Sequence, residues 1–201
     1  MVSSVSKKLV LIPEKQDGIT VQLRKVIHIS GIFIPVLATF WEKNQTIALV
    51  MFGFIIYLTI ETLKPKISND ILSMVYKDHE LEKFSIEPLS YFVSILSLLS
   101  LSFFIDEKIC FAAIAILAAG DGSAGVIGKR YGRHKLPFNK NKSWEGSISG
   151  LIAASFAGFY FAGPIAIVGG VFGMLAGAVS KQDNITVPYA ALIAMILTRW
   201  I

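Results

Sequence analysis

The residues best suited to chemistry lie at positions 120–150, where the chain reads GDGSAGVIGKRYGRHKLPFNKNKSWEGSISG. Asp121 follows an apolar run at 109–119. A carboxylate near membrane depth is costly, so an acid at the end of such a run is a candidate functional residue. Gly125 and Lys129 follow Asp121 at four-residue spacing, so on a helix the carboxylate and the amine share one stripe with no side chain between them. This stripe predicts a slot with a charge at each end.

A neighbouring stripe consists of small residues at the same spacing, namely Gly120, Ala124, Gly128 and Gly132. Small residues on a helix allow a partner backbone or a ligand to come close to that face. Helix packing is the commoner use of such a pattern. Both interpretations remain open from the sequence.

Six cations follow within 14 residues: Lys129, Arg130, Arg133, Lys135, Lys140 and Lys142. Such a run between two membrane helices commonly marks a cytoplasmic loop. The segment KSWEGS then begins the next apolar helix, which places Lys142 beside a helix N-terminus, where free N–H groups and the helix dipole favour an anion. The acid, the glycines, the cations and this helix start together predict a phosphate and metal site. Their spacing is not that of a Walker loop.

The elements that must position these residues are apolar. The chain has 201 residues, of which 54% are hydrophobic and 16% charged, and its mean hydropathy is +0.63. These values predict an all-α polytopic membrane protein rather than a soluble domain. We expect about seven transmembrane helices, with six or eight as alternatives, at 26–41, 46–63, 89–105, 109 through the motif, 147–162, 164–180 and 185–200. Several are shorter than the ~20 residues that cross a ~30 Å core, so they would extend into flanking residues or thin the bilayer.

The charges of the loops predict the orientation. With the N-terminus in the cytoplasm, the inner segments hold 16 of the 19 Lys and Arg residues, as the positive-inside rule requires. Residues 1–25 then form a cytoplasmic or interfacial segment, and 26–201 form one helical catalytic domain with cytoplasmic loops at 64–88 and 129–146. We expect a multi-pass protein whose active site faces the cytoplasm.

This topology brings other polar groups to the same face as the motif. Arg24, Lys25 and His28 would share one helix end, either as site residues or as interface anchors. Asp183 and Asn184 lie between the last two spans, where an Asp-Asn pair also commonly forms a turn or a helix cap. The net charge of +5 comes from membrane loops, so we expect no nucleic-acid partner. The first 20 residues lack an apolar core, so we expect no cleavable signal peptide, and the single Cys110 permits no internal disulfide.

GDGSAGVIGKRYG followed by KSWEGSISG resembles the signature of the dolichol kinase, phytol kinase and CTP-dependent diacylglycerol kinase family, roughly DGxAxxxGxxxG and then KSxEGS. Two weaker elements agree in order along the chain. The segment RKVIH with Gly31 is similar to the start of the family pattern, and DNITVP at 183–188 is similar to its DNxTxP element. One departure is Gly177, which lies where members often carry a Glu.

The resemblance implies transfer of the γ-phosphoryl group of CTP to the hydroxyl of a membrane lipid, typically a polyprenol or dolichol, with a divalent metal such as Mg²⁺. It implies that Asp121 is a metal ligand or the base near the lipid hydroxyl, and that Glu145 binds metal or activates the alcohol. Asp183 would be a further metal ligand. The implied phosphate and nucleotide residues are Gly122, Gly125, Gly128, Lys129, Arg133, Lys142, Ser143 and Asn184. These residue types suit phosphoryl transfer, which depends on positioning and on offsetting charge.

Two other functions remain as alternatives. A cytidylyltransferase uses the same CTP but attacks the α-phosphorus with a lipid phosphate to give a CDP-lipid. The CDP-diglyceride synthase signature, which combines Lys-Asp and HGG-type elements, is absent as a whole, since no HGG occurs in this sequence. A transporter or noncatalytic scaffold would explain the apolar helices, but it would leave the pattern of acids and cations without a role.

Overall fold

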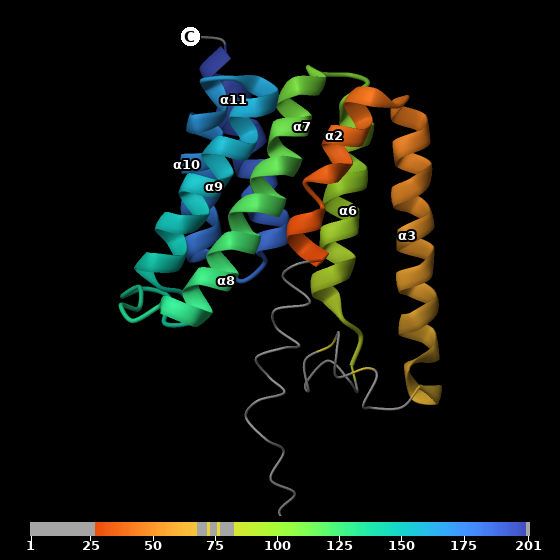
Figure 1. Cartoon of the computed structure of the whole chain (residues 1–201), viewed down its shortest axis with the longest axis horizontal. Coiled ribbons are helices and arrows are strands. Elements are labelled where there is room, and N and C mark those ends of the chain that lie inside the picture. Colours follow the sequence, from red (N-terminus) through yellow and green to blue (C-terminus); the bar gives the residue numbers. More distant parts are fainter. Residues whose placement is uncertain (1–26, 68–71, 73–75, 77–82, 200–201) are drawn as a thin grey trace, which may run out of the picture.

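The computed structural model describes residues 27–67, 72, 76 and 83–199, and these residues form a helical bundle without strands (Figure 1). The all-α prediction is therefore confirmed for the described part of the chain. In chain order the elements are α2 (Phe33–Phe40), α3 (Lys43–Leu63), the 3₁₀ turn η1 (Lys64–Lys66), α6 (Ile86–Leu101), α7 (Glu107–Ile116), the π turn η2 (Leu117–Asp121), α8 (Gly122–Tyr131), α9 (Trp144–Ala162), α10 (Ile165–Val179) and α11 (Asp183–Arg199).

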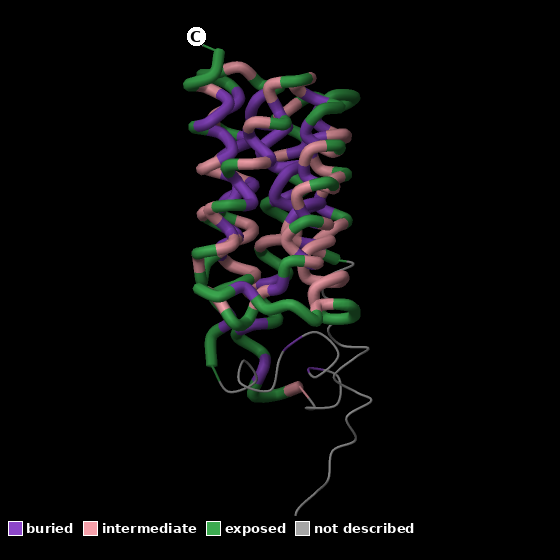
Figure 2. Tube along the Cα trace, turned by 90° about the vertical axis from the view of Figure 1, so that its left-hand side faces the viewer, coloured by how far each residue is buried: buried purple, intermediate pink, exposed green. Residues whose placement is uncertain are grey.

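Helix α7 is the centre of the bundle. Its residues from Cys110 to Ile116 are all buried, and the sequence there is apolar on every side. A helix that is apolar all round needs neighbours on all sides. Helices α2, α6, α9, α10 and α11 provide them. The buried positions consequently run through the interior of the bundle, as Figure 2 shows.

The chain continues from α7 through η2 into α8, so one helical segment reaches from residue 107 to residue 131. This agrees with the helix predicted to run from residue 109 through the motif. The sequence did not predict that residues 117–121 would be a π turn ending at Asp121. Such local widening of a helix frequently marks a functional position.

The stripe of small residues packs α8 against α9. A Cβ atom placed on Gly146 would lie 2.8 Å from the carbonyl oxygen of Ala124, and one on Gly150 would lie 2.8 Å from that of Gly120. The two backbones can approach this closely only because both helices carry glycine at the contact. Of the two interpretations of the stripe, close helix packing is the one that the structure shows, and the edge of this interface near Gly128 also borders the cavity described below.

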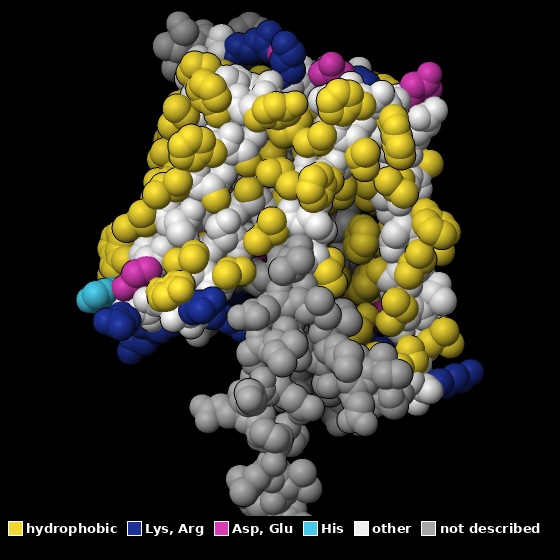
Figure 3. Space-filling view, in the orientation of Figure 1, with side chains coloured by type: hydrophobic (Ala, Val, Ile, Leu, Met, Phe, Trp, Pro, Cys, Tyr) yellow, Lys and Arg dark blue, Asp and Glu magenta, His cyan; other side chains and the backbone are white. Residues whose placement is uncertain are grey.

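The loops separate into two sets at opposite ends of the bundle. At one end, Lys43 Nζ lies 3.0 Å from a carboxylate oxygen of Glu107 and 3.1 Å from the carbonyl oxygen of Ser102, and Arg199 pairs with Asp106. Asp106 caps α7 by accepting from the backbone N–H of Lys108, and the helix begins at Glu107. Figure 3 shows apolar side chains along the wall and charged ones at the two ends.

Among the described residues, two helical segments are long and apolar enough to cross a membrane, Lys43–Lys66 and Glu107–Tyr131. Three more apolar helices are shorter: Ile27–Phe40, Ile86–Leu101 and Ile165–Val179. The expected span ranges coincide with helices to within a few residues, although the first is interrupted by a turn at Gly31 and Ile32. Seven crossings and a cytoplasmic N-terminus remain predictions.

A buried ion pair lies where α3 meets the predicted cytoplasmic loop at 64–88. Lys64 Nζ lies 2.6 Å from Glu61 Oε1 and donates to Ser85 Oγ at 2.7 Å, while the backbone N–H of Ser85 donates to the same Glu61 oxygen at 2.8 Å. The side chains of Glu61 and Lys64 are only 3% and 6% exposed. The pair ties the end of α3 to the residues that precede α6.

We expect Lys64→Met to lower the free energy of unfolding by about 3–5 kcal/mol, because it leaves the buried Glu61 carboxylate without its cation. Chemical denaturation of the purified protein in detergent measures this loss. The exposed Lys66 gives a matched control, and Lys66→Met should change stability by less than about 0.5 kcal/mol. Equal stability of the two variants would contradict the expectation.

Candidate functional site

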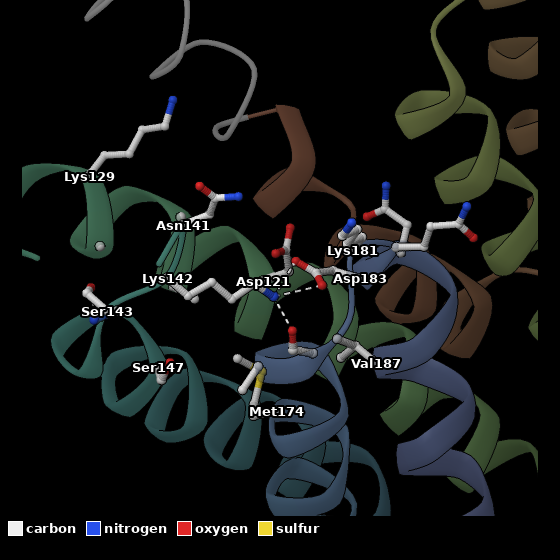
Figure 4. A pocket seen from close by; sticks show the side chains of 18 of the residues that line it. Asp121, Lys129, Asn141, Lys142, Ser143, Ser147, Met174, Lys181, Asp183 and Val187 are labelled. Carbon is white, nitrogen blue, oxygen red and sulfur yellow. Dashed lines mark hydrogen bonds and ion pairs between the residues drawn. The ribbon is translucent and has the colours of Figure 1, made fainter. Parts of the chain in front are cut away.

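A cavity of about 600 Å³ opens where α6, α8, α9, α10 and α11 meet at one end of the bundle. Figure 4 shows it from close by. The loop between α8 and α9 and the ends of α10 and α11 form much of its wall. Its polar lining residues are Tyr76, Glu87, Ser90, Asp121, Lys129, Lys135, Lys140, Asn141, Lys142, Ser143, Ser147, Lys181, Gln182, Asp183 and Asn184.

The predicted stripe of Asp121, Gly125 and Lys129 lines this cavity. Asp121 ends the π turn and Lys129 lies near the end of α8. The Asp121 side chain is only 14% exposed, whereas Lys129 is exposed. Figure 4 shows their side chains well separated on the same helical segment. The structure thus has the slot that the spacing predicts, with its acid at the deeper end.

The loop at 132–143 holds Lys142 at the cavity through its own hydrogen bonds. The backbone N–H of Leu136 donates to the Lys142 carbonyl at 3.0 Å, and the Lys142 N–H donates to the carbonyl of Asn139 at 3.0 Å. Leu136 is buried, and the Asn139 side-chain amide donates to the Ala178 carbonyl at the end of α10 at 3.0 Å. The buried Leu136 side chain and the Asn139 amide therefore both anchor the loop to the bundle.

Lys142 joins three separate parts of the chain. Its Nζ lies 2.8 Å from both carboxylate oxygens of Asp183 and also donates to the carbonyl of Gly177. These side chains are about one quarter exposed. Gly177, the position where the family pattern often has a Glu, instead offers its backbone oxygen to this lysine. Figure 4 shows Lys142 and Asp183 meeting beside Asp121.

The N-terminus of α9 also borders the cavity. Ser143 is the N-cap residue, since its Oγ accepts from the backbone N–H of Gly146 at 3.2 Å, and it is 3% exposed. Ser143, Gly146 and Ser147 all line the cavity. The positive end of the helix dipole therefore acts in the same direction as the lysines.

Asn184 borders the cavity but its amide is used within the fold. Its Nδ2 donates to the Glu87 carbonyl at 2.7 Å and lies 3.3 Å from Ser90 Oγ. These contacts join the first turn of α11 to the first turn of α6. The structure thus gives Asn184 a positioning contact, in addition to the nucleotide role that the resemblance implies.

The structure does not bring Glu145 to the cavity. Ser143, Gly146, Ser147 and Gly150 follow each other at three- and four-residue spacing and share one face of α9, whereas Glu145 lies on another face. Its carboxylate contacts His134, at 2.6 Å from Nδ1 and 3.1 Å from the backbone N–H. The resemblance groups Glu145 with Asp121 and Asp183, whereas in the structure Glu145 does not line the cavity, and its catalytic role stays a prediction. Hydrogen bonding by its own backbone N–H and by the His134 side chain lowers the pKa of Glu145 to about 2.

We expect Glu145→Gln to leave turnover within about threefold of the wild type, because the side chain acts on the loop and not on the cavity. Any stability that the ionised Glu145 confers is fully present above its ordinary pKa of 4.5 and is lost as the pH falls toward 2, because folding lowers its pKa. Melting temperatures of the wild type and Glu145→Gln should therefore differ at pH 7 and converge as the pH falls from 4.5 toward 2. A loss of turnover comparable to that of a cavity carboxylate would restore the catalytic assignment.

The remaining predicted site residues that the structure describes do not line the cavity. Gly122 is buried, and a Cβ on it would lie 2.2 Å from Ile29 Cγ1, so this glycine permits close packing against residue 29. Arg133 is exposed and does not line the cavity. Arg24 and Lys25 lie outside the described residues. His28 lies beside the cavity acid, with Nε2 3.3 Å from Asp121 Oδ2.

The sequence analysis gave several lining residues no individual role, although Lys135 and Lys140 belonged to the predicted basic run. Lys135, Lys140 and Lys181 bring the lysines at the cavity to five, against the three acids Glu87, Asp121 and Asp183. The excess of basic loop residues was visible in the sequence, but it did not indicate which of them would reach the cavity. Glu87, Ser90 and Gln182 carried no signal, because each belongs to an unremarkable helix start or loop.

The residues present fit a small divalent cation that is shared with phosphates. Asp121 and Asp183 line the cavity from two different elements. Among the described residues, no group of three or more His, Cys, Asp or Glu side chains forms a complete protein cage for a metal. Mg²⁺ is usually held by one or two carboxylates together with phosphate oxygens and waters. Such a donor set suits a metal that arrives with a nucleotide.

Comparison with known proteins identifies relatives of this chain. The profile of the Cytidylyltransferase family matches residues 11–198. A probable phytol kinase 1 of Oryza sativa subsp. japonica is 30% identical, over 87% of this chain and 63% of that protein, and a probable phytol kinase of Zea mays is 30% identical over 87% and 65%. A farnesol kinase of Arabidopsis thaliana is 43% identical over 37% of this chain and 25% of that protein. No solved structure gives a significant match.

The chain belongs to the Cytidylyltransferase family, in the polyprenol kinase group that includes the phytol and farnesol kinases. The resemblance stated from the motifs is therefore confirmed. The chain spans less than two thirds of the length of the curated relatives described above.

Proposed function

We propose that this protein is a CTP-dependent kinase of a membrane lipid alcohol, with its active site in the cavity beside Asp121. The observation that carries the proposal is that carboxylates from three elements, five lysines and a helix N-terminus border one cavity at the end of an apolar bundle. A triphosphate needs this combination of cations and N–H donors, and its metal needs the acids.

In the proposed reaction the alcohol oxygen attacks the γ-phosphorus of CTP. The new O–P bond forms as the bond between the γ-phosphorus and the bridging oxygen breaks, CDP leaves, and the alcohol proton passes to a carboxylate, for which Asp121 is the best-placed candidate. A bound Mg²⁺, held by Asp121 and Asp183, would offset the charge of the phosphates. Lys129 and Lys142 would hold the triphosphate, and the α9 N-terminus would bind a phosphate oxygen.

The proposed acceptor is an isoprenoid alcohol. The names of the relatives specify phytol and farnesol, and the motif resemblance extends the class to polyprenols and dolichol. The apolar wall of the bundle supports a multi-pass membrane protein whose lipid substrate enters from the side and keeps its tail in hydrocarbon. We further propose that the cavity faces the cytoplasm, since the loops that border it carry most of the basic residues.

A second candidate is a cytidylyltransferase that makes a CDP-lipid, because the matching family profile bears that name. The two reactions use CTP but differ in the phosphorus that is attacked. Purified protein should be incubated with Mg²⁺, a panel of phytol, farnesol, polyprenol, dolichol, diacylglycerol and the corresponding lipid phosphates, and CTP labelled at either the α- or the γ-phosphorus. We expect label in the lipid only from γ-labelled CTP. Label only from α-labelled CTP, with lipid phosphates as acceptors, would establish the transferase instead.

A further inference from the structure

Tyr91, on α6, contacts the segment that carries His28. Its hydroxyl donates to the His28 carbonyl at 2.8 Å, and its ring packs on the His28 ring with centroids 4.1 Å apart. The two residues are 63 positions apart in the chain, so only the tertiary structure brings them together. Figure 1 shows this segment before α2, between α6 and the helix that runs from α7 into α8.

The same segment is pressed against the helix that carries the cavity acid. A Cβ on Gly31 would lie 1.8 Å from the Tyr91 hydroxyl oxygen, and a Cβ on Gly122 would lie 2.2 Å from Ile29 Cγ1. Each contact therefore requires glycine at that position. Because neither glycine has a side chain, residues 28–31 fit into the narrow space between Tyr91 and the start of α8.

His28 is thereby held against Asp121. Its buried Nε2 lies 3.3 Å from Asp121 Oδ2, and the two side chains are 13% and 14% exposed. This distance lies within ion-pair range but without the geometry of a hydrogen bond, so the imidazole restrains the carboxylate by proximity and electrostatic attraction. Since Tyr91 contacts both the ring and the backbone of His28, it restrains Asp121 through His28 without bordering the cavity itself.

We propose that Tyr91 is a positioning residue of the active site, which sets the orientation of the Asp121 carboxylate through the ring and carbonyl of His28. This inference rests on the proposed kinase function, because the orientation of Asp121 matters only if that carboxylate acts on the substrate or its metal. Misplacement of a reacting group by a fraction of an ångström lowers the rate of the chemical step more than it lowers the affinity for the substrate.

The test compares Tyr91→Phe, which keeps the ring contact and removes the hydroxyl, with Tyr160→Phe, the same change at an exposed residue of α9 that does not line the cavity. We expect Tyr91→Phe to lower kcat about tenfold while the KM for CTP stays within about twofold. Tyr160→Phe should match the wild type in both. Melting temperature is measured for every variant, so that lost turnover can be separated from lost folded protein.

A second pair of variants tests the path through His28. His28→Gln keeps an N–H donor toward Asp121, whereas His28→Met does not, so His28→Gln should retain several times more of the wild-type kcat. The positioning role would be overturned by wild-type kcat in Tyr91→Phe, by a loss that follows the folded fraction alone, or by equal activity of the two His28 variants. A wild-type protein that transfers no γ-label to any alcohol would instead overturn the proposed function.

Discussion

Asp121→Asn is expected to lower phosphorylation of the lipid alcohol by about 1,000-fold or more, with little change in stability. The substitution keeps the size of the side chain but removes the charge that would bind Mg²⁺ or accept the alcohol proton. Loss of one preorganised electrostatic partner of a transition state typically costs about 100- to 1,000-fold, and here the same carboxylate is a candidate for both roles. Transfer of γ-label from CTP to lipid, measured at equal amounts of folded protein, gives the result.

Asp106→Asn is the matched control for this prediction. Asp106 undergoes the same chemical change at the opposite end of the bundle, and Asn can replace Asp as the N-cap of α7. Its turnover should stay within about twofold of the wild type. If both variants retained full activity, the cavity beside Asp121 would not be the active site.

Lys142→Met is expected to lower kcat/KM for CTP by about 100- to 1,000-fold. In this structure Lys142 neutralises Asp183, and in the proposed complex it also faces the triphosphate. Its removal therefore takes one cation from the nucleotide and removes the ion pair that Lys142 makes with the partly buried carboxylate of Asp183. Because the loss is electrostatic, raising the salt concentration should reduce the difference between the variant and the wild type.

Arg130→Met is the control for the loss of a cation. Arg130 belongs to the same basic run but is exposed and does not line the cavity, so its replacement should cost less than about threefold. Asp183→Asn, alone and combined with Lys142→Met, tests the pair. If the two residues act as a unit, the double variant should lose less activity than the product of the two single losses. Equal activity of Lys142→Met and Arg130→Met would show that the basic run acts only as a charged loop.

The motif residues show how far spacing predicts a site. Asp121, Gly125 and Lys129 could be placed on one face because the helical repeat is a local property of the backbone. The same rule separates Glu145 from Ser143, Gly146 and Ser147, but the motif match led us to group them. Glu145 was assigned by its place in a pattern, and the start of α9 at Trp144 places it on another face.

The sequence by itself determined the helical class, the approximate ends of the helices, the clustering of basic loops and the family, because periodicity, hydropathy and short motifs are all local. Only the tertiary structure decided which of the basic residues reach the cavity, that Lys142 pairs with Asp183 and that Tyr91 supports His28. These contacts join residues 41 and 63 positions apart. The first contact depends on how the loop after α8 packs against α10 and α11, and the second on how α6 packs against residues 28–31. The residue pattern within one helix does not predict its distance from another helix.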